Sequence, residues 1–464
     1  RDCSTALFDP AGEMVMQAEH IPVHLGAMPA AVAAVRDCDH APGRSWLLND
    51  PFAGGTHLPD ITVVTPVYEH ERGGALLGFA ASRAHHADVG GRVPGSMPAD
   101  STTLQEEGVV IAPTLMTDEV VDGLVEQMRQ PQQRRADLRA QLAANRVGAR
   151  RLSELAARTG TERLREATAA VLDYAERRTR ASLRELAGGE RRAVDWLEAR
   201  EGDLELRLRA TVQGDDLVLD FAGSAAQHPG NLNCPLAVTR SACLFAVRVL
   251  TDPDIPPSAG AHRPVHVHAE EGSLLHARPG AAVAAGNVET SSRVADLVLA
   301  AFGRALGQGT MNNITLGNEG FTYYETLGGG QGACPDAAGP SAVHVAMSNT
   351  LNTPVEALEL EFPLRVVEYA LRRGSGGAGR RRGGDGVVRE VEALEPMQYS
   401  LITERRRRAP AGAQGGSDGQ PGRNVLTPQG GEPQELAPKA SGELRPGDRL
   451  RLETPGGGGY GAER

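Results

Sequence analysis

Two short segments of the sequence each carry a histidine and an aspartate three residues apart, beside an apolar run of strand length. In NDPFAGGTHLPDITVVTPV, His57 and Asp60 precede the run, and in SRAHHADVGGRVPGSMP, His85 and Asp88 follow one. Imidazole nitrogens and carboxylate oxygens are suitable ligands for Zn, Mn or Fe. If the two segments face one another across neighbouring strands, His57, Asp60 and His85 supply three ligands and leave a position open for water or substrate.

The same groups have a simpler interpretation, in which they cap loops and bond to the backbone. No metal-binding motif requires the His-x-x-Asp spacing, so the pattern does not decide between the two. The Gly54-Gly55 pair lets the chain turn tightly just before His57 in either case. Both interpretations therefore stay open at this point.

Further polar residues gather in three places. GNVETSSRVAD sets Asn287, Ser292 and Arg293 at an expected helix start, which can hold a carboxylate or phosphate or simply cap the helix. MNNITLGNEGFTYYETLGGGQGA gathers Asn312 and Glu325 before a glycine run, and this composition suggests the wall of a site. We expect the arginine run at 405–408 to be a solvated surface.

The elements that must position these residues follow from the apolar periodicity. STALFDPAGEMVMQ (4–17) predicts a hairpin, DITVVTPVYEH (60–70) and GALLGFAASRA (74–84) predict strands, and LGAMPAAVAAVRDC (25–38) predicts a short helix. Residues from about 131 to 190 repeat apolar positions every three or four residues, which predicts two or three amphipathic helices in a scaffold bundle, broken at Thr159-Gly160-Thr161. Strands return near residue 193.

We therefore predict a multi-domain α+β fold of mixed strands and helices. Four regions are expected: a strand and loop domain with the metal loops (1–125), a helical segment (126–192), an α/β core with Asn/Gly-rich site loops (193–370) and a Gly/Arg-rich strand region (371–464). The glycine-rich stretches match no phosphate-binding loop, so we expect ordinary loops there.

Bulk composition narrows the class of protein. A net charge of -11 argues against nucleic acid as a partner. No run of about 18 apolar residues occurs, so we expect no membrane span. Five scattered cysteines fit a reducing compartment, and we expect a cytoplasmic protein. The chain opens RDCSTALFDP, with no starting Met and no signal peptide, which suggests a fragment.

An ordered series of motifs resembles the hydantoinase B/oxoprolinase family over nearly the whole chain. These motifs are IPVHLGAMP, GGTHLPDITVVTPV, SRAHHADVGGRVPGSMP, LQEEGV, GNVETSSRVAD, MNNITLGN, YYETLGGGQGA, LRRGSGGAGRRRGGDGVVRE, LITERR and TPGGGGYG. The forms AHHAD and PGSMPADSTTLQEEG are similar to the branch formed by the C-terminal half of ATP-dependent 5-oxoprolinase.

The resemblance implies a division of labour between two subunits. An A-type partner carries the ATP and Mg site and activates a lactam or ketone by phosphorylation, and the B-type partner, which this chain resembles, handles the activated intermediate. We expect ring opening of 5-oxoproline or a hydantoin-like cyclic amide, within glutathione metabolism. The alternatives are one part of an ATP-dependent ketone carboxylase and a non-catalytic scaffold that completes the partner's site.

The resemblance also implies a metal in the B-type protein, held near the N-terminal loops. By position this falls on His57, Asp60 and His85, with Asp2 as the fourth ligand. Three other carboxylates compete for that fourth place: Glu19, Asp50 and Asp88.

Two further residues receive catalytic roles from the resemblance and the site-wall composition. His86 is expected beside the ligands as a second-layer contact or a proton carrier. Glu325 is expected to act as a general base or acid, because a carboxylate in a glycine-rich wall can be partly desolvated.

Overall fold

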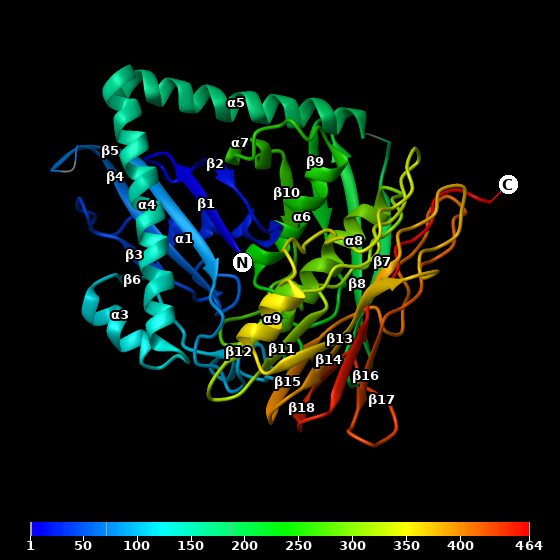
Figure 1. Cartoon of the computed structure of the whole chain (residues 1–464). Coiled ribbons are helices and arrows are strands. Elements are labelled where there is room, and N and C mark those ends of the chain that lie inside the picture. The colour runs from blue at the N-terminus through cyan, green and yellow to red at the C-terminus, as the bar shows by residue number, and fades with distance from the viewer. Residues whose placement is uncertain (1, 71, 187, 464) are drawn as a thin grey trace.

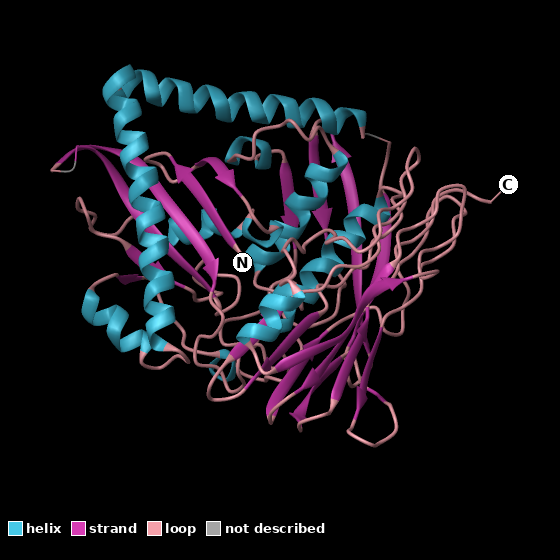
Figure 2. Cartoon of the chain, in the orientation of Figure 1, coloured by secondary structure: helices cyan, strands magenta, loops and turns pink. Residues whose placement is uncertain are grey.

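The computed structural model describes residues 2–70, 72–186 and 188–463. Its strands form four sheets, and helices cover the first two of them (Figures 1 and 2). This arrangement of segregated sheets and helices confirms the predicted α+β class. The two histidine segments belong to the first sheet.

The first sheet has six strands in the order β2-β1-β5-β4-β3-β6, with antiparallel neighbours. The strands are β1 Cys3–Phe8, β2 Met14–Ala18, β3 Trp46–Leu48, β4 Asp60–His70, β5 Gly73–His85 and β6 Thr114–Leu115. The predicted hairpin and both predicted strands are confirmed. Strand β4 is almost continuously buried, because α1 (Ala27–Val35) packs on one face of the sheet and α4 (Pro131–Thr159) on the other.

The helical segment begins after the short α2 (Leu104–Glu107) and α3 (Asp118–Val125). Gly160, with φ +87°, separates α4 from α5 (Thr161–Glu185), which confirms the predicted break. The expected bundle is replaced by an elbow: α4 lies on the first sheet, whereas α5 runs on to contact α7 (Ala259–His262) near the second sheet (Figure 1).

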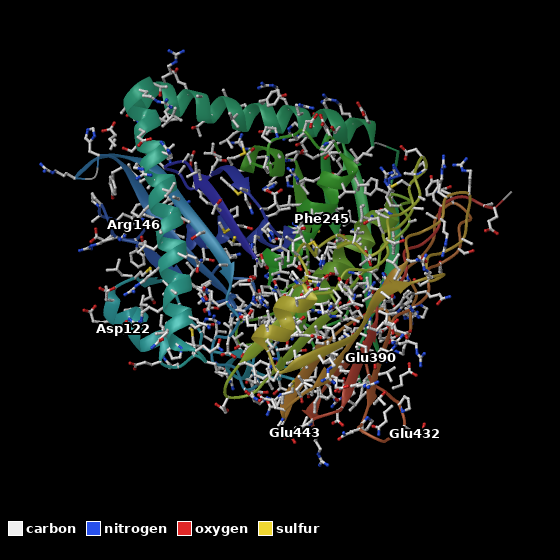
Figure 3. All side chains as sticks on the ribbon, viewed as in Figure 1. Asp122, Arg146, Phe245, Glu390, Glu432 and Glu443 are labelled. Atoms are coloured by element: carbon white, nitrogen blue, oxygen red, sulfur yellow. The ribbon has the colours of Figure 1, made fainter. Side chains whose placement is uncertain are left out.

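Helix α4 is fixed to the first sheet by two buried amide side chains. Gln141 donates to the carbonyl oxygen of Ile61 at 2.9 Å, and Asn145 donates to that of Val63 at 2.9 Å. Arg146, labelled in Figure 3, lies on the exposed side of the same helix. The polar face of α4 is therefore divided between sheet contacts and solvent.

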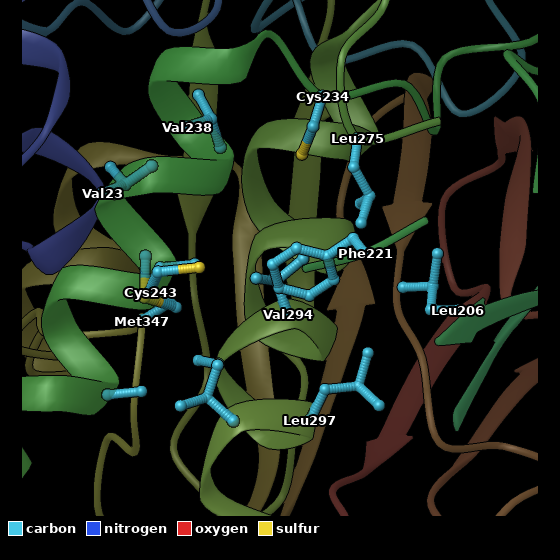
Figure 4. Close-up of a cluster of buried hydrophobic side chains, with 14 of the residues drawn as sticks. Val23, Leu206, Phe221, Cys234, Val238, Cys243, Leu275, Val294, Leu297 and Met347 are labelled. Carbon is cyan, nitrogen blue, oxygen red and sulfur yellow. The ribbon is translucent and has the colours of Figure 1, made fainter. Parts of the chain in front are cut away.

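The second sheet has the order β10-β9-β8-β7 and packs against two buried helices. Its strands are β7 Arg191–Glu198, β8 Asp203–Gln213, β9 Asp216–Asp220 and β10 Val265–His268. The helices are α6 Leu236–Leu250 and α8 Ser291–Ala301, the latter preceded by a π-helical turn, η2 Gly286–Thr290. Figure 4 shows the apolar core that joins them, including Phe221, Cys243 and Leu297.

The third and fourth sheets pack face to face around a shared apolar core. Their orders are β12-β11-β15-β18 and β13-β14-β19-β16-β17. The bounds are β11 Asn313–Gly317, β12 Thr322–Glu325, α9 Val355–Glu361, β13 Leu364–Arg372, β14 Gly386–Ala393, β15 Met397–Ile402, β16 Arg423–Thr427, β17 Gln434–Glu435, β18 Lys439–Leu444 and β19 Arg449–Glu453. The third sheet joins strands from both sides of the expected boundary at residue 370, because β11 pairs with β15.

A layer built mainly of glycine backbone adjoins this sandwich; we call it the glycine layer (328–332, 374–386, 411–419 and 455–461). Figure 1 shows these segments running together toward the C-terminus. The N–H of Gly457 donates to the carbonyl oxygen of Gly384 at 2.9 Å, and that of Gly330 donates to Pro455 at 3.0 Å. A Cβ on Gly457 would lie 2.1 Å from the carbonyl oxygen of Gln331, so only glycine fits.

Two further findings concern the surroundings of the chain. Within the described ranges, no helix combines the length and apolarity that crossing a bilayer requires. All five cysteines are free thiols, of which Cys234 and Cys243 are buried. The expected cytoplasmic location stays a prediction.

Candidate functional site

The two histidine segments meet where the neighbouring strands β4 and β5 begin and end, which is the arrangement that a shared metal site requires. Asp60 begins β4, His85 ends β5, and the two residues are direct partners in the antiparallel register. His57, in the loop before β4, places its Nε2 atom 3.3 Å from Oδ2 of Asp60. The rings of His57 and His85 lie 5.1 Å apart between centroids. Ligand atoms of these three residues all fall within 4.8 Å of one another, close enough to share one ion.

A second group of potential ligands shares Asp60. Asp2, just before β1, and His24, at the end of the 3-10 turn η1 (Pro22–His24), also place ligand atoms within 4.8 Å of Asp60. The Ser4 hydroxyl lies 2.8 Å from Nδ1 of His24, and His24 Nε2 lies 3.4 Å from Asp60 Oδ2. His24 is absent from the predicted ligand set. Its contact with Asp60 depends on pairing between distant strands, which no local spacing reveals.

Burial and charge set the protonation of this cluster. Burial alone would raise the pKa of Asp60, but His57 and His24 lower it well below its ordinary value. Burial lowers the pKa of His85 to about 3, with the neighbouring His57 adding to the effect. Burial raises the pKa of Asp2, and the charge of Asp60 contributes. An ionised Asp60 and a neutral His85 imidazole are the forms that bind metal ions.

The unpaired polar atoms of the cluster also fit a bound cation. Several of its buried polar atoms have no hydrogen-bond partner among the described residues: Asp2 Oδ1, His24 Nε2, His57 Nδ1 and Nε2, Asp60 Oδ1 and His85 Nε2. Buried polar atoms are rarely left without a partner in folded proteins. Such a concentration of lone pairs fits a divalent cation bound by nitrogen and oxygen.

A cavity of about 310 Å³ opens beside the cluster. Asp2 and His85 line one side, and β12 lines the other. The ring of Tyr324 stacks on His85 at 4.6 Å between centroids, and its hydroxyl donates to Asn313 at 2.7 Å. The expected site wall is thus adjacent to the metal-ligand candidates.

Glu325 lines the same cavity, with both carboxylate oxygens engaged. Its Oε1 atom accepts the N–H of Thr353 at 2.5 Å, and Oε2 accepts the hydroxyl of Tyr323. The guanidinium of Arg389 lies 3.8 Å from Oε2. The carboxylate is therefore oriented by three groups from three parts of the chain.

His86 and Asp88 lie apart from the ligand cluster. His86 turns away from His85, as successive strand residues do, and its Nε2 atom lies 2.9 Å from the side-chain oxygen of Gln141 on α4. Asp88 accepts the N–H groups of Gly90 and Gly95 and pairs with Arg129 at 3.1 Å, so it orders its own loop. The proton-carrier role of His86 stays a prediction, with no cavity contact to support it.

The four expected substrate-binding residues also lie outside the described lining of this cavity. Ser292 donates back to the carbonyl oxygen of Val288 at 2.7 Å, and the buried Asn287 belongs to the π-helical turn. Asn312 accepts from Arg406 at 2.9 Å. Their substrate-binding role therefore stays a prediction, with no contact to this cavity among the described residues.

Arg293, the fourth of them, lies within a buried ion network. Its guanidinium contacts Asp195 at 3.3 Å, Asp296 at 3.1 Å and Glu404 at 3.2 Å. Arg405 joins two of these carboxylates, with 2.7 Å to Asp195 and 2.6 Å to Asp296. The prediction that residues 405–408 form a solvated surface is wrong for Arg405, which is 2% exposed, because β7 and α8 supply carboxylates that neutralise it.

The chain is similar to known proteins in sequence and in fold. A sequence profile of the hydantoinase B/oxoprolinase family matches residues 1–463. The chain is 38% identical to 5-oxoprolinase 1 of Arabidopsis thaliana, over 99% of this chain and 39% of that protein. It is 28% identical to a protein of Pseudomonas sp. (strain NS671) named as the B component of a D-/L-hydantoinase, over 99% of this chain and 84% of that protein. The crystal structure of the ATP-dependent caprolactamase from Pseudomonas jessenii superposes with a TM-score of 0.92 at 27% identity, covering 100% of this chain and 85% of that one. The chain spans about two fifths of the length of the 5-oxoprolinases it matches.

Proposed function

Because this chain belongs to the hydantoinase B/oxoprolinase family, we propose that it is the ring-opening part of an ATP-dependent cyclic-amide hydrolase. An A-type partner, carrying ATP and Mg, phosphorylates the amide oxygen of the ring. The activated ring then reaches this chain. The similarity to a protein named as the B component of a hydantoinase supports the two-part arrangement.

One observation carries the proposal: the buried His/Asp cluster opens onto a cavity of about 310 Å³. That volume suits a small ring with one substituent and is at the low end of ligand pockets in general. A site that combines candidate metal ligands with a small adjacent cavity fits hydrolysis of a compact substrate.

We assign a divalent cation, Zn, Mn or Fe, to His57, Asp60 and His85, with Asp2 and His24 as the remaining candidates. Such a cation supplies Lewis acidity and lowers the pKa of water. The chain's own residues fix the arrangement. Among them, Thr56 donates to Asp60 at 2.5 Å, which orients the carboxylate toward the histidines.

The reaction has three bond changes. Water adds to the ring carbon that bears the phosphorylated oxygen, and the ring C–N bond breaks as its nitrogen takes up a proton. The resulting acyl phosphate is hydrolysed to a carboxylate and inorganic phosphate. Glu325 lines the cavity and is held by Tyr323 and Thr353, so we propose that this carboxylate moves the proton.

The substrate that we propose is 5-oxoproline or a hydantoin-like ring. The relatives named 5-oxoprolinase favour the first, and the caprolactamase shows that this fold accommodates a protein acting on a different lactam. The described lining contains no Lys or Arg, so a substrate carboxylate would find no cationic side chain in it. Neutral lactams therefore belong in the same assay as 5-oxoproline.

The testing experiment measures ADP and glutamate release from 5-oxoproline and ATP, using this chain purified together with its A-type partner. We expect coupled release of both products that disappears when this chain is omitted. Caprolactam and hydantoin replace 5-oxoproline in parallel, each with its ring-opened product measured. A requirement for bicarbonate would contradict hydrolysis and favour a carboxylase. Unchanged product release after joint replacement His57→Ala and His85→Ala would show that the chain is only a scaffold.

A further inference from the structure

A loop at the rim of the candidate cavity carries one solvent-exposed leucine and is held by hydrogen bonds on both sides of it. The loop comprises residues 349–353, and its central residue is Leu351. Its hydrogen bonds join Asn349 to His20, Thr350 to Thr326, Asn352 to Thr326 and Tyr369, and Thr353 to Glu325. Anchors in three separate parts of the chain, at His20, Glu325–Thr326 and Tyr369, hold the loop in place, so it is not built to swing closed over the cavity.

Leu351 is 90% exposed despite these anchors, and Leu360 on α9 is 88% exposed. They are the two most exposed large apolar side chains of the described residues. Val367, Tyr369 and Leu371 of β13 add further exposed apolar area nearby in the chain. Presenting large apolar side chains to water on an ordered framework is unfavourable in isolation and is typical of binding surfaces.

The segment that carries these two leucines is acidic, and its first basic residue is Arg365, at the start of β13. Residues 349–364 contain Glu356, Glu359 and Glu361 and no Lys, Arg or His. All three glutamates are exposed. We call Leu351, Leu360 and these glutamates the Leu351 surface. A complementary surface has an apolar recess with Lys or Arg at its edge.

The Leu351 surface is continuous with the candidate site, since Thr350, Leu351, Thr353 and Glu361 also line the cavity. A phosphorylated amide is short-lived in water, so the protein that makes it has to deliver it at this rim. The matched 5-oxoprolinase of Arabidopsis extends far beyond the 39% that this chain covers, so the relative contains additional chain. These points favour a delivering protein over a second copy of this chain.

We propose that the Leu351 surface is the docking site of the ATP-binding A-type partner, with Leu351 inserted into a recess edged by basic residues. This inference rests on the proposed function and adds the place of contact. Docking at this rim would bring the partner's ATP site next to the candidate cavity. The activated ring would then have the shortest path between the two sites. The Glu325 carboxylate then serves the interface as well, because it anchors Thr353 in the loop.

The test measures the affinity of the full chain for the purified A-type protein of the same organism, by biolayer interferometry. We expect Leu351→Asp and Leu360→Asp each to weaken binding by about tenfold or more. The matched control is Val249→Asp on α6, which is 49% exposed and far along the chain from this loop. Glu356→Lys is expected to weaken binding most at low salt, because screening reduces its effect.

Melting temperature and bound metal are measured for every variant, so that a folding defect is separated from a lost contact. Equal affinity of the wild type and both leucine variants would overturn the docking site while leaving the proposed function intact. Self-association of the chain alone that Leu351→Asp abolishes would overturn it in favour of a second copy. A wild-type chain that binds no A-type protein would overturn the proposed partner and this inference together.

Discussion

Asp60 and His85 face each other directly across β4 and β5, one at the first residue of its strand and the other at the last. Because side chains alternate between the two faces of a strand, a slip of one residue in this register would turn one of them away. The ligand cluster therefore depends on the pairing of these two strands, and α1 and α4 hold that pairing from opposite faces.

The first prediction concerns the metal ligands. His85→Ala and Asp60→Asn should each reduce bound metal in the purified chain to near background, because each removes one donor of a small buried set. His86→Ala is the matched control, because the imidazole of His86 is next to His85 in the chain but faces Gln141. Elemental analysis by mass spectrometry measures the content. Full metal content in His85→Ala would contradict the assignment.

The second prediction concerns Glu325. In the complex with the partner, Glu325→Gln should lower kcat by about a hundredfold or more, because the amide cannot exchange the proton. The pH profile of kcat should change as well, which a purely structural role would not require. Steady-state kinetics across pH provides the measurement. An unchanged kcat accompanied by weaker partner binding would instead restrict Glu325 to anchoring Thr353.

The third prediction separates structure from substrate binding at Arg293. Arg293→Met should destabilise the fold by about 3–5 kcal/mol, because it removes one buried cation of a network in which Asp195, Asp296 and Glu404 need neutralising. Arg146→Met, on the exposed side of α4, should have little effect. Urea unfolding gives both values. A normal stability combined with a raised KM would show that Arg293 contacts the substrate.

The fourth prediction is a pH dependence of stability from Glu289, in the π-helical turn. Burial raises its pKa to about 8 from an ordinary 4.5, and the charge of Glu404 contributes. Between these values the native state keeps a proton that the unfolded chain has lost. The stabilisation is therefore complete below about pH 4.5 and disappears as the pH rises through 8.

Glu289→Gln removes this dependence, because the amide is neutral throughout. Between pH 6 and pH 8, the unfolding free energy of the wild type should fall by about 2 kcal/mol more than that of Glu289→Gln. Denaturant melts at the two pH values measure this difference. Glu126→Gln, at an exposed position after α3, should show no comparable change. Parallel pH curves for Glu289→Gln and the wild type would refute the shifted titration.

The fifth prediction concerns the glycine layer. Gly457→Ala should lower the melting temperature sharply or prevent folding, because its Cβ would lie 2.1 Å from a backbone oxygen that cannot move alone. Gly123→Ala in α3 is the control, as its Cβ meets nothing within 4 Å. That control should be neutral or stabilise the chain by up to about 1 kcal/mol. Thermal unfolding followed by circular dichroism distinguishes them.

Local pattern predicted a large part of the fold. The continuous apolar runs of β4 and β5 and the break at Gly160 are encoded within a few residues of where they occur. The metal-ligand candidates His57 and His85 could be proposed for the same reason, since each belongs to a short motif beside a strand. Contacts between segments far apart in the chain could not be predicted from local pattern.

His24 and Arg405 are two residues whose contacts the local sequence could not predict. His24 joins the cluster only because η1 packs beside β1, where Ser4 orients the imidazole. Arg405 is buried only because Asp195 and Asp296 come from a strand and a helix more than 100 positions earlier in the chain. In both cases the partner is fixed by tertiary packing, and the local sequence around the residue contains no sign of it.

The glycine layer also gives the molecule two regions with different responses to temperature. Apolar burial dominates the heat capacity of unfolding, and the apolar cores therefore lose stabilisation on cooling. The layer is held by backbone hydrogen bonds between segments that bury few apolar side chains. Glycine also loses more conformational freedom on ordering than any other residue. The ordered glycine layer is therefore favoured at low temperature and opposed at high temperature. Warming should therefore loosen the C-terminal layer before the sheets that hold the ligand cluster.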